Sequence, residues 1–96
     1  MRNKKDNQWV KDILGDPDII SVIAALSFVN LKGNEIDVLK HRFLDGRTQN
    51  ETAEILDIDP RTVQRREYEA LRKCEIVWKN NSFAKFILQK QKEKLP

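Results

Sequence analysis

The chain has 96 residues, of which 40% are apolar and 34% are charged, enough for one small domain with a single core. It contains one His and one Cys, which excludes the usual zinc sites and an internal disulfide. We therefore expect no metal, no cofactor and no enzymatic activity. Lysine and arginine number 18 against 15 acidic residues, a net charge of +3, which is compatible with a nucleic-acid partner without demonstrating one.

The start of the chain predicts two helices. Residues 6–14 favour a short first helix that Gly15 ends. Asp16 and Pro17 are a start signal, with Asp as the N-cap and Pro as the first helical residue, and they predict a second helix over about 17–30. This second helix is apolar on nearly every side, so we expect it to be covered all round, by its own domain or by a second chain.

A third helix is predicted over about 35–45. Asn34 is its expected N-cap, Asp37 takes the capping-box position, and Gly46 ends it. Apolar residues recur along it at spacings of three and four. These spacings predict a buried stripe made of Ile36, Leu39, Phe43 and Leu44.

The next stretch predicts two helices joined by a short turn. Thr48 and Glu51 form a Thr-x-x-Glu capping box that opens a helix to about Leu56. After three turn residues, an Asp-Pro pair at 59–60 supplies an N-cap and a first helical residue. The helix that starts there is expected to run to about Trp78.

A last helix is predicted over 83–94, after a break at residues 80–81 and with Ser82 as its N-cap. No segment shows the alternation of a strand, so we expect an all-α protein of five to six helices. It forms a single domain over 1–96 with a helix-turn-helix core over 34–78. The longest apolar run has about eleven residues, too short to cross a bilayer, so we expect no membrane contact and a cytoplasmic location.

The short helix, the tight turn and the longer helix after it form the pattern of a helix-turn-helix. Residues 60–74 carry five basic and two acidic side chains, whereas residues 34–59 carry three basic and seven acidic ones. A basic helix held at a fixed angle suits the major groove, where Arg pairs with guanine and Gln with adenine. A charge run is often only a solvated face, so this pattern favours DNA without deciding for it.

The candidate site consists of side chains expected to project from these two helices. The residues expected to read bases are Arg61, Gln64 and Arg65. The residues expected to contact the DNA backbone are Thr48, Thr62 and Arg66.

The stretch from Glu35 to Cys74 resembles region four of the bacterial sigma factors, the domain that reads the −35 promoter element. The matching features, in order, are Val38 to Gly46, Thr48, Glu51, Ala53 to Leu56, Ile58, Thr62, Val63, Arg66 and Ala70 to Lys73. The resemblance implies a helix-turn-helix fold and double-stranded DNA as the partner. It also implies base contacts by the start of the second helix of the motif.

Three positions depart from the pattern of that family. Thr52 stands where an apolar residue is usual, which is expected to loosen the packing of the first helix of the motif. Asp57 replaces the commoner turn Gly, and Asp tolerates the left-handed conformation better than most residues. Cys74 replaces Leu and is expected to be a small, buried and unreactive side chain. His41 is expected at the surface or at its boundary.

We therefore interpret the chain as a sequence-specific DNA-binding transcription regulator. It resembles small regulators of phages and mobile elements, because the residues before the motif are too few for the promoter-melting domains of a complete sigma factor. The flanks, 1–33 and 79–96, either complete the core or form a two-fold homodimer. Open alternatives are a module that docks on RNA polymerase or a sigma factor, and a phage DNA-packaging or recombination accessory protein.

Overall fold

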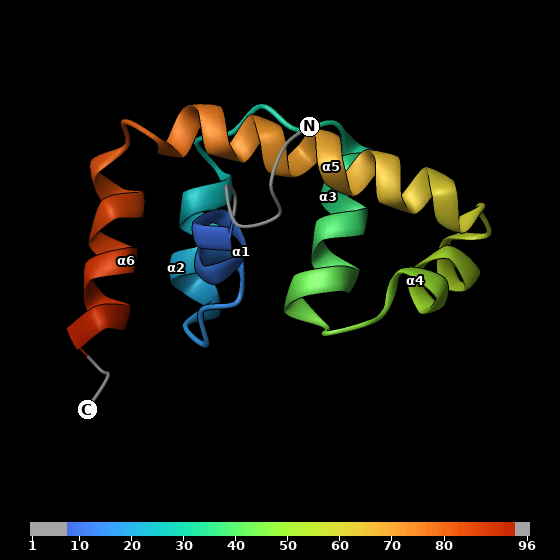
Figure 1. Ribbon diagram of the computed structural model, residues 1–96, viewed down its shortest axis with the longest axis horizontal. Helices are drawn as coiled ribbons and strands as arrows, with labels where there is room; N and C mark the ends of the chain where they lie inside the picture. Colours follow the sequence, from blue (N-terminus) through green and yellow to red (C-terminus); the bar gives the residue numbers. More distant parts are fainter. Residues whose placement is uncertain (1–7, 94–96) are drawn as a thin grey trace.

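The computed structural model describes residues 8–93 and confirms an all-α protein with a helix-turn-helix (Figure 1). Within these residues there are six α-helices, one π-helical segment and no strand. The elements in chain order are α1 (Gln8–Leu14), α2 (Ile19–Leu26), α3 (Gly33–Leu39), η2 (Lys40–Leu44, the π-helical segment), α4 (Gln49–Leu56), α5 (Pro60–Trp78) and α6 (Ser82–Glu93).

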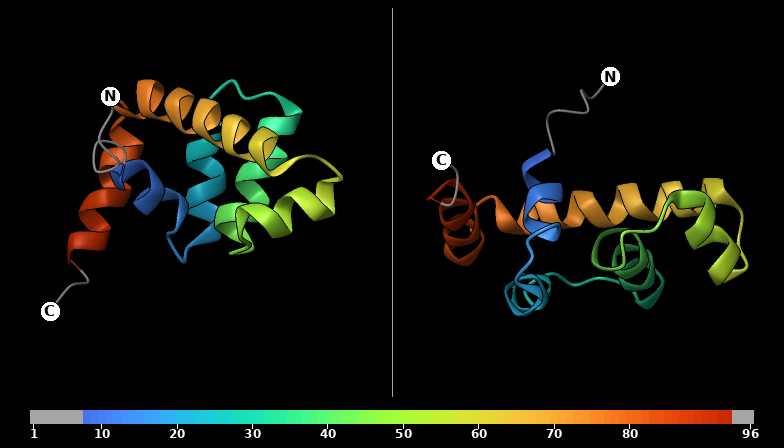
Figure 2. Two further views of the ribbon diagram at one scale, coloured as in Figure 1. Left: turned by 45° about the vertical axis from the view of Figure 1, so that its right-hand side comes forward. Right: turned by 90° about the horizontal axis from the view of Figure 1, so that it is seen from below.

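The long helix α5 organises the molecule. It runs along the longest dimension, which measures 39 Å, and the other helices lie on one side of it (Figure 1). The helices α1, α2 and α6 lie under its C-terminal half, and α3 and α4 lie under its N-terminal half. Seen from below, α2 and α3 are offset to the same side of α5 (Figure 2).

The larger of two hydrophobic cores lies where α1, α2 and α6 meet the C-terminal half of α5. Ile13, Val22 and Ile87 are fully buried in it. Trp78 is its largest side chain and is 1% exposed. The indole Nε1–H of Trp78 donates a hydrogen bond to the carbonyl oxygen of Ala25 at 2.9 Å, so the buried indole leaves no unpaired donor.

The smaller core joins α3, α4 and the start of α5. Val38, Ala53 and Val63 are its buried members, with Leu56 and Ile58 packed against them. Ala53 is 3% exposed and Val63 is fully buried, as a close crossing of the two helices of the motif requires. This core therefore fixes the position of α5 relative to α4.

Local signals place the helix ends around the turn as predicted. The Oγ1 of Thr48 accepts a hydrogen bond from the Glu51 backbone N–H at 3.0 Å, and the Glu51 carboxylate accepts one from the Thr48 N–H at 2.8 Å. Asp59 caps α5, since its Oδ1 accepts from the Arg61 backbone N–H at 2.7 Å. Gly46 ends the preceding helical segment with a φ of +67°, a conformation that favours glycine.

The prediction for the start of the second helix was wrong. The N-cap is Asp18 and not Asp16, so α2 begins at Ile19 and Pro17 precedes the helix. Asp16 instead accepts a hydrogen bond from the Asp18 backbone N–H at 2.7 Å and lies 3.6 Å from Lys90 Nζ on α6. Both Asp residues are able to cap, and Lys90 lies 3.5 Å from Asp18 as well, so the ion pairs hold this turn to α6 without selecting the cap.

Two other caps also differ from the prediction. The capping box of α3 uses Glu35, whose Oε1 accepts from the Lys32 backbone N–H at 2.8 Å, in place of Asn34 and Asp37. At the last helix, Asn81 Oδ1 accepts from two backbone N–H groups, those of Phe83 and Ala84, at 2.9 and 3.1 Å. The capping residues therefore lie two residues earlier than predicted at α3 and one residue earlier at α6.

The exposed faces correct one expectation about burial and bear on one alternative of another. Ile36 is 46% exposed, so the buried stripe of α3 includes Val38 in its place and keeps Leu39, as predicted. The domain does not cover α2 all round, since Ile20 is 80% exposed. The same helix is also too short for a transmembrane segment, and none of the helices within residues 8–93 is long and apolar enough to cross a membrane.

Candidate nucleic-acid interface

The turn between α4 and α5 is built to hold the two helices at one angle. Asp57 ends α4 in the left-handed conformation, with a φ of +55°, as the sequence predicted for an Asp in place of Gly. The backbone N–H of Ile58 then donates to the Ala53 carbonyl at 3.0 Å, which satisfies a carbonyl at the end of the helix. The start of α5 is therefore fixed by backbone bonds on one side and by the smaller core on the other.

A polar network under α5 adds a second attachment. Glu67 points into the protein, with its side chain 8% exposed, and pairs with the guanidinium of Arg42 on η2. Arg42 also donates from a terminal nitrogen to the Arg47 carbonyl at 2.6 Å, and Gln49 Nε2 lies 3.5 Å from Glu67. Because Glu67 belongs to α5, this network ties that helix to both η2 and α4.

Sequence reasoning missed this network. Arg42 and Glu67 are 25 residues apart, so no local spacing links them. The available signal was the position of Glu67, four residues after Val63 on the buried face of α5. An acidic residue at such a position needs a partner. The π-helical segment supplies it, since the Asp45 N–H bonds to the Lys40 carbonyl at 3.0 Å and Arg42 lies within that wider turn.

A second ion pair holds the middle of α5 to α3. Lys73 Nζ lies 2.8 Å from Glu35 Oε1, and the Glu35 side chain is 1% exposed. Burial alone raises the pKa of Glu35, but hydrogen bonds from Lys73 and the Lys32 N–H outweigh it and hold the pKa below its ordinary value. Burial, with the nearby Glu35 charge, raises the pKa of the Cys74 thiol to about 12. Cys74 is fully buried, as predicted.

The arginines among residues 8–93, taken with Lys73 and Lys90, fall into two groups. One group is engaged in structural ion pairs and consists of Arg42, Arg47, Lys73 and Lys90. The other group lies on α5, where no hydrogen bond or ion pair with a described residue engages the guanidinium groups of Arg61, Arg65, Arg66 and Arg72. Since the engaged cations already hold the fold together, the second group is available to a ligand.

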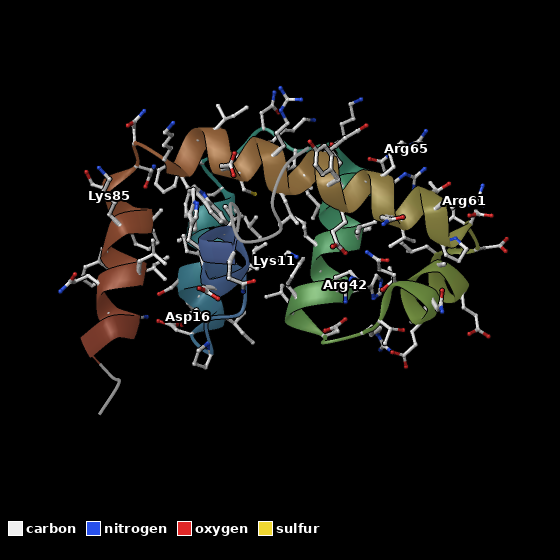
Figure 3. The ribbon with its side chains drawn as sticks, viewed as in Figure 1. Lys11, Asp16, Arg42, Arg61, Arg65 and Lys85 are labelled. Atoms are coloured by element: carbon white, nitrogen blue, oxygen red, sulfur yellow. The ribbon has the colours of Figure 1, made fainter. Side chains whose placement is uncertain are left out.

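The predicted base-reading residues lie together on the outward side of α5. Arg61, Gln64 and Arg65 are exposed, and Figure 3 shows Arg61 and Arg65 on the first turns of α5, directed away from the helices below. Arg65 and Arg72 are seven residues apart, so they share one face of the helix. The structure thus brings these three side chains to one accessible surface.

The three predicted backbone contacts lie on the margins of this surface. Thr62 and Arg66 are half-buried along one flank of α5. Thr48 is exposed at the start of α4, where its hydroxyl oxygen already accepts from Glu51. Hydrogen bonds from the Thr48 backbone and hydroxyl hold the pKa of Glu51 below its ordinary value. The first N–H groups of α4 are what remains for a phosphate.

Two further positions were singled out by the sequence. Thr52 is fully buried, and its Oγ1 has no hydrogen-bond partner among the described residues. His41 is half-buried, with Nδ1 3.5 Å from Asp45 Oδ2. No group of three or more His, Cys, Asp and Glu side chains suited to a metal ion occurs in the described part of the chain.

Comparison with known families agrees with this geometry. Residues 28–75 match the family described as Sigma-70, region 4. The chain belongs to the sigma-70 region 4 family. Sigma-70 region 4 is a DNA-binding helix-turn-helix family. Comparison with the curated proteins and with the solved structures gave no match.

The residues that match sigma-70 region 4 cover only part of the structure. It includes α3, η2, α4 and α5 up to Glu75, and with them the Arg42–Glu67 pair and the free arginines. The helices α1, α2 and α6 lie outside it. The larger core is therefore formed mostly by elements that flank the family domain.

Proposed function

We propose that this protein is a sequence-specific DNA-binding transcription regulator that places the start of α5 in the major groove. In this proposal the residues that read bases are Arg61, Gln64 and Arg65. The residues that contact the DNA backbone are Thr48, Thr62 and Arg66. Double-stranded DNA is the partner, and no cofactor is required.

The observation that carries the proposal is the group of unpaired arginines on the first three turns of α5. Elsewhere in the described chain, Arg42, Lys73 and Lys90 hold carboxylates at close range, so the protein pairs cations where the fold needs them. Arg61 and Arg65 are exposed without such partners. A guanidinium in that state is free to form two hydrogen bonds to guanine O6 and N7.

The attachment of α5 supports the same proposal. A recognition helix reads bases only if its angle to the rest of the domain is fixed, because its side chains must reach base edges while the neighbouring helix contacts the backbone. Here the smaller core, the turn at Asp57 and the Arg42–Glu67 pair hold α5 at three points. The first turns of α5 extend beyond α3 above α4 (Figure 1), which leaves their outer face open.

The test compares two arginines of the same helix face. Duplexes that bind the wild-type protein are first selected from a random pool. The affinities of wild type, Arg65→Ala and Arg72→Ala are then measured on the selected site and on random duplex. Arg72 is a matched control, since it is exposed and unpaired like Arg65 but lies about 10 Å further along α5, away from the end that reads bases.

We expect Arg65→Ala to weaken binding to the selected site by about 1–3 kcal/mol, or roughly 5–150-fold, with little effect on random duplex. Arg72→Ala is expected to cause a smaller loss that is equal on both duplexes, as for a phosphate contact. An equal loss on both duplexes for Arg65→Ala would remove it from the base-reading set. No affinity of the wild type for duplex DNA at low salt would overturn the proposal and favour a protein-docking module.

A further inference from the structure

Tyr68 stands on the outer face of α5 and has no part in the proposed function. Its side chain is 48% exposed, and no hydrogen bond or ring contact joins it to another described residue. It lies three residues after Arg65 and four residues before Arg72, so both arginines are its neighbours on the helix surface. A hydroxyl donor between two unpaired guanidinium groups suits an anionic ligand.

A ridge of exposed side chains runs along this face at intervals of four residues. It consists of Gln64, Tyr68, Arg72 and Ile76, and residues at this spacing follow one another on the surface of a helix. The first three side chains end in hydrogen-bonding groups, whereas Ile76 is apolar and 63% exposed. The polar part of the ridge therefore begins at the base-reading end of α5 and ends at Arg72.

The position of Tyr68 along α5 fits the edge of the major groove. Tyr68 lies eight residues after Pro60, the first residue of α5, or about 12 Å along the helix axis. The major groove of B-DNA is about 12 Å wide and about 8.5 Å deep. With the start of α5 on the floor of the groove, Tyr68 is therefore level with the phosphates that border it.

Arg72 can reach the same place. Its Cα lies about 6 Å beyond that of Tyr68 along the helix axis. A long side chain on a helix leans toward the N-terminus and covers the preceding turn. The guanidinium of Arg72 therefore extends back over the turn that holds Tyr68, where both side chains can meet one ligand.

Two carboxylates lie near this ridge without neutralising its arginines. Glu69 is exposed on the far side of Arg65 and Arg72 from Tyr68, and Glu75 is half-buried beyond Arg72. No hydrogen bond or ion pair joins either carboxylate to Arg65 or Arg72. The positive charge beside Tyr68 is therefore available to an anion.

We propose that Tyr68 and Arg72 together bind one phosphate of the DNA backbone at the edge of the major groove. The Tyr68 hydroxyl donates a hydrogen bond to the phosphate, and the Arg72 guanidinium neutralises its charge. This contact sets how far α5 enters the groove and carries no sequence information. The inference rests on the proposed function, because it takes the start of α5 as the end that reads bases.

The test measures the affinity of the full chain for the selected duplex and for random duplex over a range of salt concentrations. The variants are Tyr68→Phe, which removes only the hydroxyl, Arg72→Ala and the double variant. Ile76→Ala is the matched control, since it shortens an exposed side chain of the same ridge one turn beyond Arg72. The three substituted side chains are exposed in the folded chain, and circular dichroism checks that the helical content is unchanged.

We expect Tyr68→Phe to weaken binding about fivefold to tenfold and equally on both duplexes. The salt slope is expected to stay the same, because the lost hydroxyl carries no charge, whereas Arg72→Ala is expected to make the slope less negative by about 0.9. Because the two side chains share one phosphate, the double variant is expected to lose less affinity than the product of the two single losses. Ile76→Ala is expected to bind as wild type does.

A loss for Tyr68→Phe on the selected duplex alone would make Tyr68 a base contact and overturn the proposal. Independent losses in the double variant, or a loss for Ile76→Ala equal to that for Tyr68→Phe, would also overturn it. If the wild type binds duplex DNA and Tyr68→Phe binds equally well, only this inference fails. A wild type that binds no duplex would overturn the proposed function as well.

Discussion

The C-terminal half of α5 lies in a large apolar core with three flanking helices, whereas the N-terminal half is held by a small core and by ion pairs. Trp78, Ile13 and Ile87 are almost fully buried at the first end, and three apolar side chains form the buried core at the second. Arg61 and Arg65, which pair with none of the described residues, are exposed at the second end. The comparison teaches that one helix can anchor the domain with one half and present a binding surface with the other.

The different roles of the two halves of α5 predict which substitutions alter stability and which also alter DNA affinity. Changes in the large core are expected to alter the stability of the whole domain with little effect on DNA affinity of the folded protein. Changes in the network under the recognition helix are expected to alter both. If substitutions at the two ends of α5 changed stability and DNA affinity in the same proportion, the two halves would not have different roles.

The largest effect is expected from Trp78→Ala. It removes a side chain that is 1% exposed, together with its hydrogen bond to the Ala25 carbonyl. The cavity and the lost burial are expected to lower the free energy of unfolding by about 3–5 kcal/mol. Urea denaturation measures this loss, and DNA affinity below the onset of unfolding is expected to stay near that of wild type. A loss below about 1 kcal/mol would contradict the anchoring role.

A smaller effect is expected from Glu67→Gln. The substitution keeps the shape of the side chain but removes the charge that pairs with Arg42 under α5. We expect a loss of about 1–3 kcal/mol in unfolding free energy, and weaker binding to the selected duplex because α5 is held less firmly. Glu69→Gln is the matched control, since Glu69 is exposed on the same helix, and its effect is expected within about 0.5 kcal/mol. Equal effects of the two substitutions would contradict the role of the network.

The smallest of the stability effects is expected from the titration of Glu35. Its pKa is lower in the folded protein than in the unfolded chain, so the carboxylate stabilises the fold at neutral pH. That contribution is lost as the pH falls below about 4.3 and through the folded-state value. Denaturation measured at a series of pH values is expected to show a weaker acid dependence for Glu35→Gln than for wild type. An unchanged dependence would show that the Lys73–Glu35 pair adds nothing.

Sequence reasoning succeeded where structure depends on neighbouring residues. The capping box of Thr48 and Glu51, the Asp59 cap and the left-handed Asp57 were all predicted, because each involves groups within a few residues. The outward placement of Arg65 followed from helical spacing in the same way. Whether these side chains read DNA bases remains a prediction.

Sequence reasoning failed where local signals allow more than one option or where the partner is distant in the sequence. Asp16 and Asp18 are both suited to cap α2, and Lys90 on α6 lies within 3.6 Å of a carboxylate oxygen of each, so neither local spacing nor this cation singles out Asp18 as the cap. Likewise, Arg42 meets Glu67 only because a π-helical turn places it beneath α5. No sequence spacing contains that information, since it depends on how the helices pack.

The salt dependence of binding to random duplex tests the central claim most directly, because it counts the phosphates that the free cations neutralise. The slope of log association constant against log salt falls by about 0.9 for each phosphate contacted. With Arg66 and Arg72 on phosphates, we expect a slope of about −2. A slope near zero would contradict the account, since α5 would then not be bound to the DNA backbone.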